Sequence, residues 1–216
     1  MIDVIMIGGS GLVGKKTAAR LSVRDDVRLL SFVRRMPHAG YERQLSFEGL
    51  IHDGREALGI GHADVAVSCL GTTMRRAGSK GAFRRVDYDY VYAFAQAARR
   101  LGARQFIMVS SVGATRSTSN YYLSVKAEIE AAVAKLGFER FDVIRPGLLL
   151  GTRRELRFAE RLAGHAMPLL HPFLRGANAR WRATQSEVVA RAVADLVGAE
   201  SPGRFLYENP ELEMLE

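Results

Sequence analysis

The sequence predicts an α/β fold in which a doubly wound parallel sheet is covered by helices on both faces, a three-layer αβα arrangement. Short apolar runs alternate with segments of helical periodicity along the 216 residues, and the connections between them are short. The first apolar run, residues 2–7, also leads directly into a glycine-rich turn and then into a helical segment. Because no Pro/Gly/Ser-rich linker interrupts the chain, residues 1–216 are expected to form a single domain.

The individual elements follow from the spacing of apolar residues and from the turns that close them. Strands are expected where the apolar runs are short, at residues 2–7, 27–33, 47–51, 63–70, 105–111, 141–147 and 205–208. Helices are expected where apolar residues recur every three to four positions, at residues 12–22, 83–101, 121–136, 154–164 and 186–198. The C-terminal part adds only a short substrate-side region. Within it, residues 165–181 mix Pro, Gly, His and aromatic residues, which suits a loop over a substrate pocket or packing at the sheet edge.

The composition excludes several classes of protein. The formal net charge is +8, but the arginines are scattered in pairs such as Arg99 and Arg100 and do not gather with aromatic residues. We therefore expect no nucleic-acid partner. No apolar run approaches the roughly 18 residues of a membrane span, so no membrane partner is expected either. The first residues, MIDVIMIGGSG, lack the basic start of a signal peptide.

The cysteine and histidine content points to a reducing compartment and away from a metal. A single cysteine, Cys69, excludes an internal disulfide, and its place at the end of an apolar run is typical of a small buried hydrophobe. The five histidines show no metal-ligand spacing. We expect a cytoplasmic protein without a bound metal.

The glycines after the first strand predict a dinucleotide site. Gly8, Gly11 and Gly14 follow a G-x-x-G-x-x-G pattern, one position different from the standard fingerprint. Residues without a Cβ let the backbone turn tightly and approach a pyrophosphate, and the following helix presents free N–H groups to it. Such a turn between a strand and a helix is typical of the Rossmann fold. Its residues expected to contact the cofactor are Gly8, Ser10, Gly11, Leu12, Val13 and Gly14.

The end of the second strand favours NADPH over NADH. In dinucleotide-binding folds an acidic residue about 20 residues after the glycines binds the ribose 2′-hydroxyl, whereas an arginine meets a 2′-phosphate. Arg34 and Arg35 follow the strand here, and no acidic residue occurs between Arg28 and Tyr41. The alternative is that both arginines are solvated. Asp53, after the third expected strand, is a candidate partner for the adenine amino group or a cap of the following turn.

A candidate proton-transfer group lies on the helix expected at residues 121–136. Tyr122 and Lys126 are four positions apart, so both reach one side of the helix. A neighbouring ammonium favours the phenolate form of a tyrosine and suits it to exchange a proton with a carbonyl or alcohol oxygen. Tyr121 is the alternative phenol, but it lies five positions from the lysine.

Two serines end the preceding strand. Ser110 and Ser111 lie at its carboxyl end, which is where ligands bind in open α/β sheets. A hydroxyl at this edge can donate a hydrogen bond to a substrate oxygen.

The order of these motifs resembles that of the short-chain dehydrogenase/reductase superfamily. From residue 4 to about residue 200 the chain is similar to an atypical branch, the family of the mammalian Tat-interacting oxidoreductase-like protein and its microbial relatives. The resemblance is carried by Cys69–Thr73, Val86–Val91, Tyr122–Lys126 and Arg145–Gly147. Two features depart from the better-known enzymes of the superfamily: C-L-G-T-T replaces N-A-G after the fourth strand, and the region after Gly147 is short.

The resemblance implies how a cofactor would be held. The three glycines Gly8, Gly11 and Gly14 would bind the pyrophosphate. The run Leu70, Gly71 and Thr72 would lie along the cofactor, and Pro146 would lie beside the nicotinamide carboxamide.

The resemblance also implies a mechanism. Ser111 would orient the substrate, Tyr122 would act as the acid/base, and Lys126 would contact the nicotinamide ribose and tune the phenol. We therefore expect an NADPH-dependent oxidoreductase that acts on a small carbonyl or alcohol substrate. The alternative is a dinucleotide-binding regulatory or interaction protein with little or no turnover.

Overall fold

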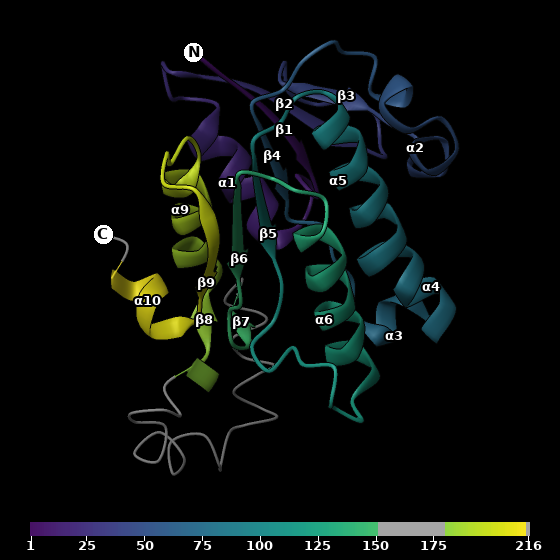
Figure 1. The fold of residues 1–216 in the computed structure, drawn as a ribbon, viewed down its shortest axis with the longest axis vertical. Helices are drawn as coiled ribbons and strands as arrows, with labels where there is room; N and C mark the ends of the chain where they lie inside the picture. The colour runs from purple at the N-terminus through teal and green to yellow at the C-terminus, as the bar shows by residue number, and fades with distance from the viewer. Residues whose placement is uncertain (151–179, 215–216) are drawn as a thin grey trace.

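A parallel sheet of seven strands forms the centre of the protein. The computed structural model describes residues 1–150 and 180–214 (Figure 1). Every neighbouring pair in the sheet is parallel, and the strand order is β3-β2-β1-β4-β5-β6-β9. The strands are β1 (Ile2–Ile7), β2 (Val27–Val33), β3 (Glu42–Gln44), β4 (Val65–Ser68), β5 (Gln105–Val109), β6 (Arg140–Ile144) and β9 (Gly203–Tyr207).

The direction of winding reverses at β1. The chain first moves outward through β2 and β3, and then crosses to the other side of β1 to form β4, β5 and β6. In a parallel sheet all carboxyl ends lie at one edge, and ligands bind where the order reverses. The loops after β1 and β4 therefore mark the expected site.

Helices cover both faces of the sheet, which confirms the predicted Rossmann architecture (Figure 1). On one face α1 (Leu12–Leu21) packs beside α9 (Ser186–Leu196), and α10 (Asn209–Met214) adjoins α9. On the other face α5 (Tyr90–Arg100) lies beside α6 (Tyr121–Ala134). A separate pair of short strands, β7 (Leu149–Leu150) and β8 (Thr184–Gln185), lies outside the main sheet.

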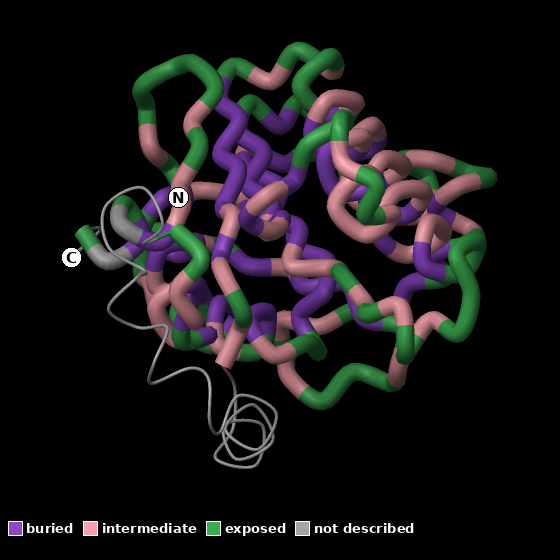
Figure 2. The backbone as a smooth tube through the Cα atoms, turned by 90° about the horizontal axis from the view of Figure 1, so that it is seen from below, coloured by how far each residue is buried: buried purple, intermediate pink, exposed green. Residues whose placement is uncertain are grey.

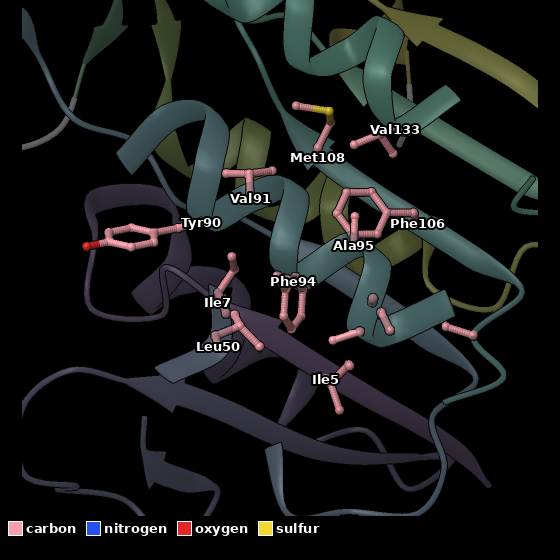
Figure 3. Packing of buried hydrophobic residues seen from close by; sticks show 14 of the residues in the cluster. Ile5, Ile7, Leu50, Tyr90, Val91, Phe94, Ala95, Phe106, Met108 and Val133 are labelled. Carbon is pink, nitrogen blue, oxygen red and sulfur yellow. The ribbon is translucent and has the colours of Figure 1, made fainter. Parts of the chain in front are cut away.

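The buried residues gather at the centre of the molecule and the exposed residues in the loops (Figure 2). Each face of the sheet has its own apolar cluster. On the α5 face, Phe94 and Phe106 are fully buried and Tyr90 packs near Ile7 and Leu50 (Figure 3). Burying an aromatic or branched side chain of this kind contributes about 1.5–3 kcal/mol each, so these clusters dominate the stability of the fold.

A buried polar network joins the amino ends of β5 and β6. The Gln105 amide donates a 2.7 Å hydrogen bond to Asp142, whose carboxylate also pairs with Arg140 at 2.8 Å. The Tyr207 hydroxyl donates to Asp142 at 3.2 Å, and its pKa is raised to about 12 by burial and by the negative charge of Asp142. Gln105 also binds the Leu196 carbonyl at 2.7 Å, so the network fixes the end of α9 against the sheet.

One predicted strand is wrong. Residues 47–51 belong to the helix α2 (Phe47–Asp53) and not to a strand. Ser46 accepts a hydrogen bond from the Gly49 amide and so caps the helix, while Phe47 and Leu50, three positions apart, both face the core. The third strand is instead β3, a short polar segment that sequence hydropathy does not reveal.

The helix expected at residues 83–101 is divided. It consists of α4 (Lys80–Arg84), a π-helical turn η2 (Arg85–Asp89) and α5. The short α3 (Met74–Ala77) precedes it, and η1 (Gly54–Leu58) follows α2. The helix expected at 154–164, and all but Arg180 and Trp181 of the loop expected at 165–181, lie outside the described residues.

Gly14 tests the packing of α1 against the glycine turn. A Cβ at Gly14 would lie 2.1 Å from the Gly8 carbonyl oxygen, so the helix must shift to accept a side chain. We expect Gly14→Ala to lower the free energy of unfolding by about 1–3 kcal/mol, measured by urea denaturation. Gly11→Ala is the control, because its Cβ would lie 3.2 Å from the same oxygen at a φ of −79°. Equal stability of the two variants would contradict this packing.

Candidate active site

The glycine turn lies against the loop that follows β4. Gly8 has a φ of +82°, and a Cβ there would lie 2.3 Å from the Cys69 carbonyl carbon. The Gly11 amide donates a 2.9 Å hydrogen bond to the Gly8 carbonyl, which closes the turn. No side chain caps the start of α1 and its first turn carries no acidic residue, so its amides are left for an anion.

The predicted turn residues divide by exposure. Ser10 and Gly11 are exposed and Leu12 is half-buried, whereas Val13 is buried. The exposed backbone at the start of the helix is therefore the part of the turn that a ligand can reach. Gly11, which has no Cβ at this exposed position, leaves the backbone open to the approach of a pyrophosphate.

The two arginines after β2 have different surroundings. Arg35 forms two hydrogen bonds with Glu42, at 2.7 and 2.9 Å. Burial opposes ionisation of Glu42, but the hydrogen bonds from Arg35 and from the backbone outweigh it and lower the pKa of the carboxyl. Arg34 is exposed, and its guanidinium lies 6.0 Å from the centre of the Phe47 ring. Of the pair, Arg34 is the one whose charge is not committed to an acidic partner within the described residues.

A polar and aromatic cluster, which sequence reasoning missed, surrounds the Arg34 side. The Glu48 carboxylate accepts hydrogen bonds from Arg85 and from the Tyr90 hydroxyl, and these lower its pKa. The Phe47 and Tyr90 rings meet edge to face, 5.3 Å apart. The cluster escaped prediction because residues 47–51 were expected to form a strand.

Asp53 does not lie where the sequence predicted. It ends α2 and is exposed, so it does not follow a strand. Its neighbour Gly54 faces the guanidinium of Arg100 at the end of α5, which is the amino-edge side of the sheet. The prediction that Asp53 follows the third strand is therefore wrong, because that strand ends at Gln44.

The loop after β4 covers a buried ion pair. The Lys126 ammonium lies 2.7 Å from the Asp87 carboxylate, and both side chains are almost fully buried. The Thr72 amide donates a 2.8 Å hydrogen bond to the other oxygen of Asp87. A Cβ at Gly71 would lie 3.3 Å from Asp87 and 3.5 Å from the Lys126 Nζ, so this loop passes directly over the pair. Leu70 packs against the core on the same side.

The ion pair keeps Lys126 charged. Burial lowers the pKa of the ammonium, but attraction by Asp87, Tyr122 and Glu130 outweighs burial and raises the pKa above its usual value. Asp87 comes from the π-helical turn η2, a distortion that occurs frequently at functional sites. The surrounding run Val86–Val91 carries part of the family resemblance, but the sequence alone assigns Asp87 no role. The signal that could have found it is the need of a buried lysine for an acidic partner.

The tyrosines at the start of α6 are also distinguished by their contacts. The Tyr121 hydroxyl donates a 3.1 Å hydrogen bond to the Lys80 carbonyl, so its phenol ties α6 to α4. Among residues 1–150 and 180–214 the Tyr122 hydroxyl has no hydrogen-bond partner, while its ring packs 5.4 Å from Phe83. Of the two phenols, Tyr122, which the sequence favours as the acid/base, is thus the one whose hydroxyl is unpaired among the described residues.

The two serines after β5 divide in the same way. The Ser110 hydroxyl donates a 2.6 Å hydrogen bond to Glu130, which also accepts two hydrogen bonds from Arg145. Ser111 is half-buried, and within residues 1–150 and 180–214 its hydroxyl makes only a long 3.4 Å contact with the next carbonyl. The Val112 amide donates to the carbonyl of buried Pro146 at 3.0 Å, which brings the loops after β5 and β6 together.

The Cys69 thiol and a cluster of possible metal ligands do not add a reactive group to the carboxyl edge of the sheet. Burial raises the pKa of the Cys69 thiol to about 12, so it stays protonated and unreactive. Within the described residues, ligand atoms of Asp3, His62 and Asp64 lie within 4.8 Å of one another, but at the opposite edge of the sheet. Their carboxylates already bind Arg28, His62 and a backbone amide. None of the described helices is long and apolar enough to span a membrane.

The Asp87–Lys126 pair can be tested by removing one charge. Asp87→Asn keeps an acceptor for the Thr72 amide but leaves a buried ammonium unpaired, so the variant should lose about 3–5 kcal/mol of stability. The control is Asp87→Asn combined with Lys126→Met, which removes both charges and should recover much of that loss. The measurement is urea denaturation of all three proteins. A single variant as stable as the unmutated chain would refute the pairing.

Comparison with curated proteins finds relatives over nearly the whole chain. The FMP52 protein of Coccidioides immitis is 30% identical over 94% of this chain and 91% of its own length. The fmp52 protein of Emericella nidulans is 32% identical over 90% of this chain and 87% of its own length. The HTATIP2 protein of Rattus norvegicus is 52% identical, but over only 48% of this chain and 42% of its own length. No family model matches the sequence.

These relatives correct one expectation. The fungal proteins are named mitochondrial, which points away from the purely cytoplasmic location expected from the sequence. The error arose because a lone cysteine indicates a reducing environment, which is not peculiar to the cytosol.

Solved structures share the fold at low sequence identity. The enzyme WbmH of Bordetella bronchiseptica, in complex with NAD+, superposes with a TM-score of 0.69 at 14% identity, over 97% of this chain and 76% of its own. A short chain dehydrogenase family protein from Francisella tularensis gives 0.66 at 13% identity, over 99% of both chains. The solved structures thus show the fold, and the fungal relatives show the family. The chain belongs to the family of the fungal FMP52 proteins.

Proposed function

We propose that the protein is an NADPH-dependent oxidoreductase that interconverts a small carbonyl compound and its alcohol. The observation that carries the proposal is Lys126, a buried and charged ammonium four positions after a phenol without a hydrogen-bond partner in the described part of the chain. Ser111, at the end of β5, supplies a hydroxyl at the same edge of the sheet. Together these groups have the chemistry that proton transfer to a carbonyl oxygen requires.

The cofactor site is proposed from the glycine turn. The backbone from Gly8 to Gly14 would hold the pyrophosphate, and the run from Leu70 to Thr72 would lie along the cofactor. Solved neighbours bound to NAD or NAD+ support a nicotinamide dinucleotide. Arg34, exposed and stacked near Phe47, would meet a 2′-phosphate, which favours NADPH.

The chain's own residues would then perform the acid/base chemistry. When bound, the reduced nicotinamide supplies a hydride. Ser111 donates a hydrogen bond that holds the substrate oxygen, and Tyr122 donates the proton to that oxygen. Lys126 stabilises the phenolate that remains, because a positive charge lowers the cost of a nearby negative one. Asp87 holds Lys126 in place beneath the loop after β4.

The preference for NADPH can be tested with the two arginines as a matched pair. The unmutated protein should bind NADPH at least about tenfold more tightly than NADH, roughly 1.4 kcal/mol, measured by calorimetry. Arg34→Ala should narrow this difference by weakening NADPH binding only. Arg35→Ala should keep the preference and lower the stability, because it leaves the buried carboxylate of Glu42 without its partner. Equal affinities for the two dinucleotides would show that Arg34 is merely solvated.

The proton donor can be tested with the two tyrosines. Tyr122→Phe keeps the ring that packs on Phe83 and removes only the hydroxyl. Turnover of a reactive aldehyde should fall at least about a hundredfold while NADPH binding survives. Tyr121→Phe is the control, since its hydroxyl binds the Lys80 carbonyl, and it should retain activity. Loss of activity only in the Tyr121 variant would assign proton transfer to the other phenol.

One observation favours the regulatory alternative. The ammonium of Lys126 is already paired with Asp87, whereas the catalytic role asks it to serve a ribose and a phenol as well. The test is whether the protein binds NADPH but reduces no aldehyde, ketone or quinone. If so, and if Tyr122→Phe binds NADPH as tightly as the unmutated chain, the protein is a dinucleotide-binding regulatory protein.

A further inference from the structure

The sole tryptophan of the chain lies beside the candidate catalytic groups. Gly113 adopts a φ of +79°, and a Cβ there would lie 2.5 Å from the Cη2 atom of Trp181 and 3.5 Å from Cδ1 of Leu123. The indole therefore rests on the bare backbone of Gly113. Gly113 comes two positions after Ser111, and Leu123 directly follows Tyr122. The ring lies next to the loop and the helix start that carry both groups.

This position is built by specific backbone contacts. A Cβ at Gly147 would lie 1.9 Å from the carbonyl oxygen of Arg182, so the chain after Trp181 packs directly on the loop after β6. The Asn209 side-chain amide donates a hydrogen bond to the same carbonyl. Thr184 forms two hydrogen bonds with this loop. Its amide donates to the Leu148 carbonyl at 2.9 Å, and its hydroxyl accepts from the Gly147 amide at 3.0 Å. Trp181 is therefore anchored at the carboxyl edge.

The indole is nevertheless incompletely covered. Trp181 is 42% exposed, although it is the largest apolar side chain available for burial. The Arg180 guanidinium lies 5.6 Å from its ring centre, which gives the ring a polar neighbour. Among the described residues, an exposed aromatic face thus lies next to the segments that carry Tyr122 and Ser111. Binding pockets combine apolar walls with a few polar groups in this way.

We propose that Trp181 forms an apolar wall of the substrate pocket and selects planar, aromatic carbonyl compounds. The inference rests on the proposed oxidoreductase function and specifies its substrate class. Reduction of an aromatic aldehyde adds a hydride to the carbonyl carbon as NADPH becomes NADP+, and adds the Tyr122 proton to the oxygen, which gives the alcohol. The phenolate then regains its proton from water. Stacking on the indole favours a flat ring over a puckered ring of similar size.

The experiment compares two primary alcohols with the same carbon skeleton, one with a flat aromatic ring and one with a puckered saturated ring. Benzyl alcohol and cyclohexylmethanol are titrated into the NADPH-loaded protein, followed by calorimetry and by tryptophan emission, which reports Trp181 alone. With the nicotinamide already reduced, neither alcohol is turned over. We expect benzyl alcohol to bind roughly fivefold more tightly and to change the emission. Equal affinities, or an emission that does not respond, would overturn the proposal.

Three variants separate packing from recognition. Trp181→Phe keeps an aromatic face and should retain the preference for benzyl alcohol, whereas Trp181→Ala should lose it. Gly113→Ala places a methyl group where the ring rests, so it should shift the emission and abolish the preference with the tryptophan still present. An unchanged preference in Trp181→Ala would overturn the proposal even if that variant is less stable.

The outcomes also distinguish the two proposals. NADPH binding and Tyr122-dependent turnover without any preference for the flat ring would refute the role of Trp181 alone. Failure to bind NADPH would refute both. Binding of NADPH and a preference for the flat ring, with full activity in Tyr122→Phe, would refute the proposed proton donor and leave the wall intact.

Discussion

The ion pair between Lys126 and Asp87 is the contact on which the arrangement of the site depends. It joins three segments distant in sequence: the loop after β4, the π-helical turn before α5, and the helix α6. Two charges removed from water are expensive unless each meets its partner at close range. The packing of these segments is therefore restrained to positions in which the carboxylate reaches both the ammonium and the Thr72 amide. The same pairing restrains α6, the helix that also carries Tyr122.

A second buried carboxylate does the same for the neighbouring strands. Glu130, on α6, binds Ser110 at the end of β5 and Arg145 at the end of β6. Because Ser110 is committed to this contact, Ser111 is the hydroxyl left at the edge. Helix α6 thus has two roles. Its first turn carries Tyr122, and Glu130 in its later part binds the residues that follow β5 and β6. A displacement of this helix would therefore move Tyr122, Lys126 and Glu130 together.

The sequence predicted most of the sheet and the position of the glycine turn, because both depend on local pattern. β1 and α1 are fixed by an apolar run, three glycines and helical periodicity, all within 20 residues. Residues 47–51 were misassigned because their apolar content suits a strand, whereas the cap at Ser46 and the spacing of Phe47 and Leu50 favour a helix. Asp87 pairs with Lys126, which is distant in the sequence, and Glu42 lies on β3, a strand that the sequence did not predict. No local pattern reveals such pairs.

The buried network of Gln105, Arg140 and Asp142 lies toward the amino ends of β5 and β6, away from the candidate site, and the Tyr207 hydroxyl reaches it from the last residue of β9. In β5 and β6 the polar contacts that stabilise the sheet are thus separated by the length of the strand from the residues of the candidate site. Inherited changes in the loops of the carboxyl edge can alter what is bound without loosening the polar contacts that hold β5, β6 and α9 together. Such a division leaves the substrate-facing loops free to diverge among relatives that retain the same sheet.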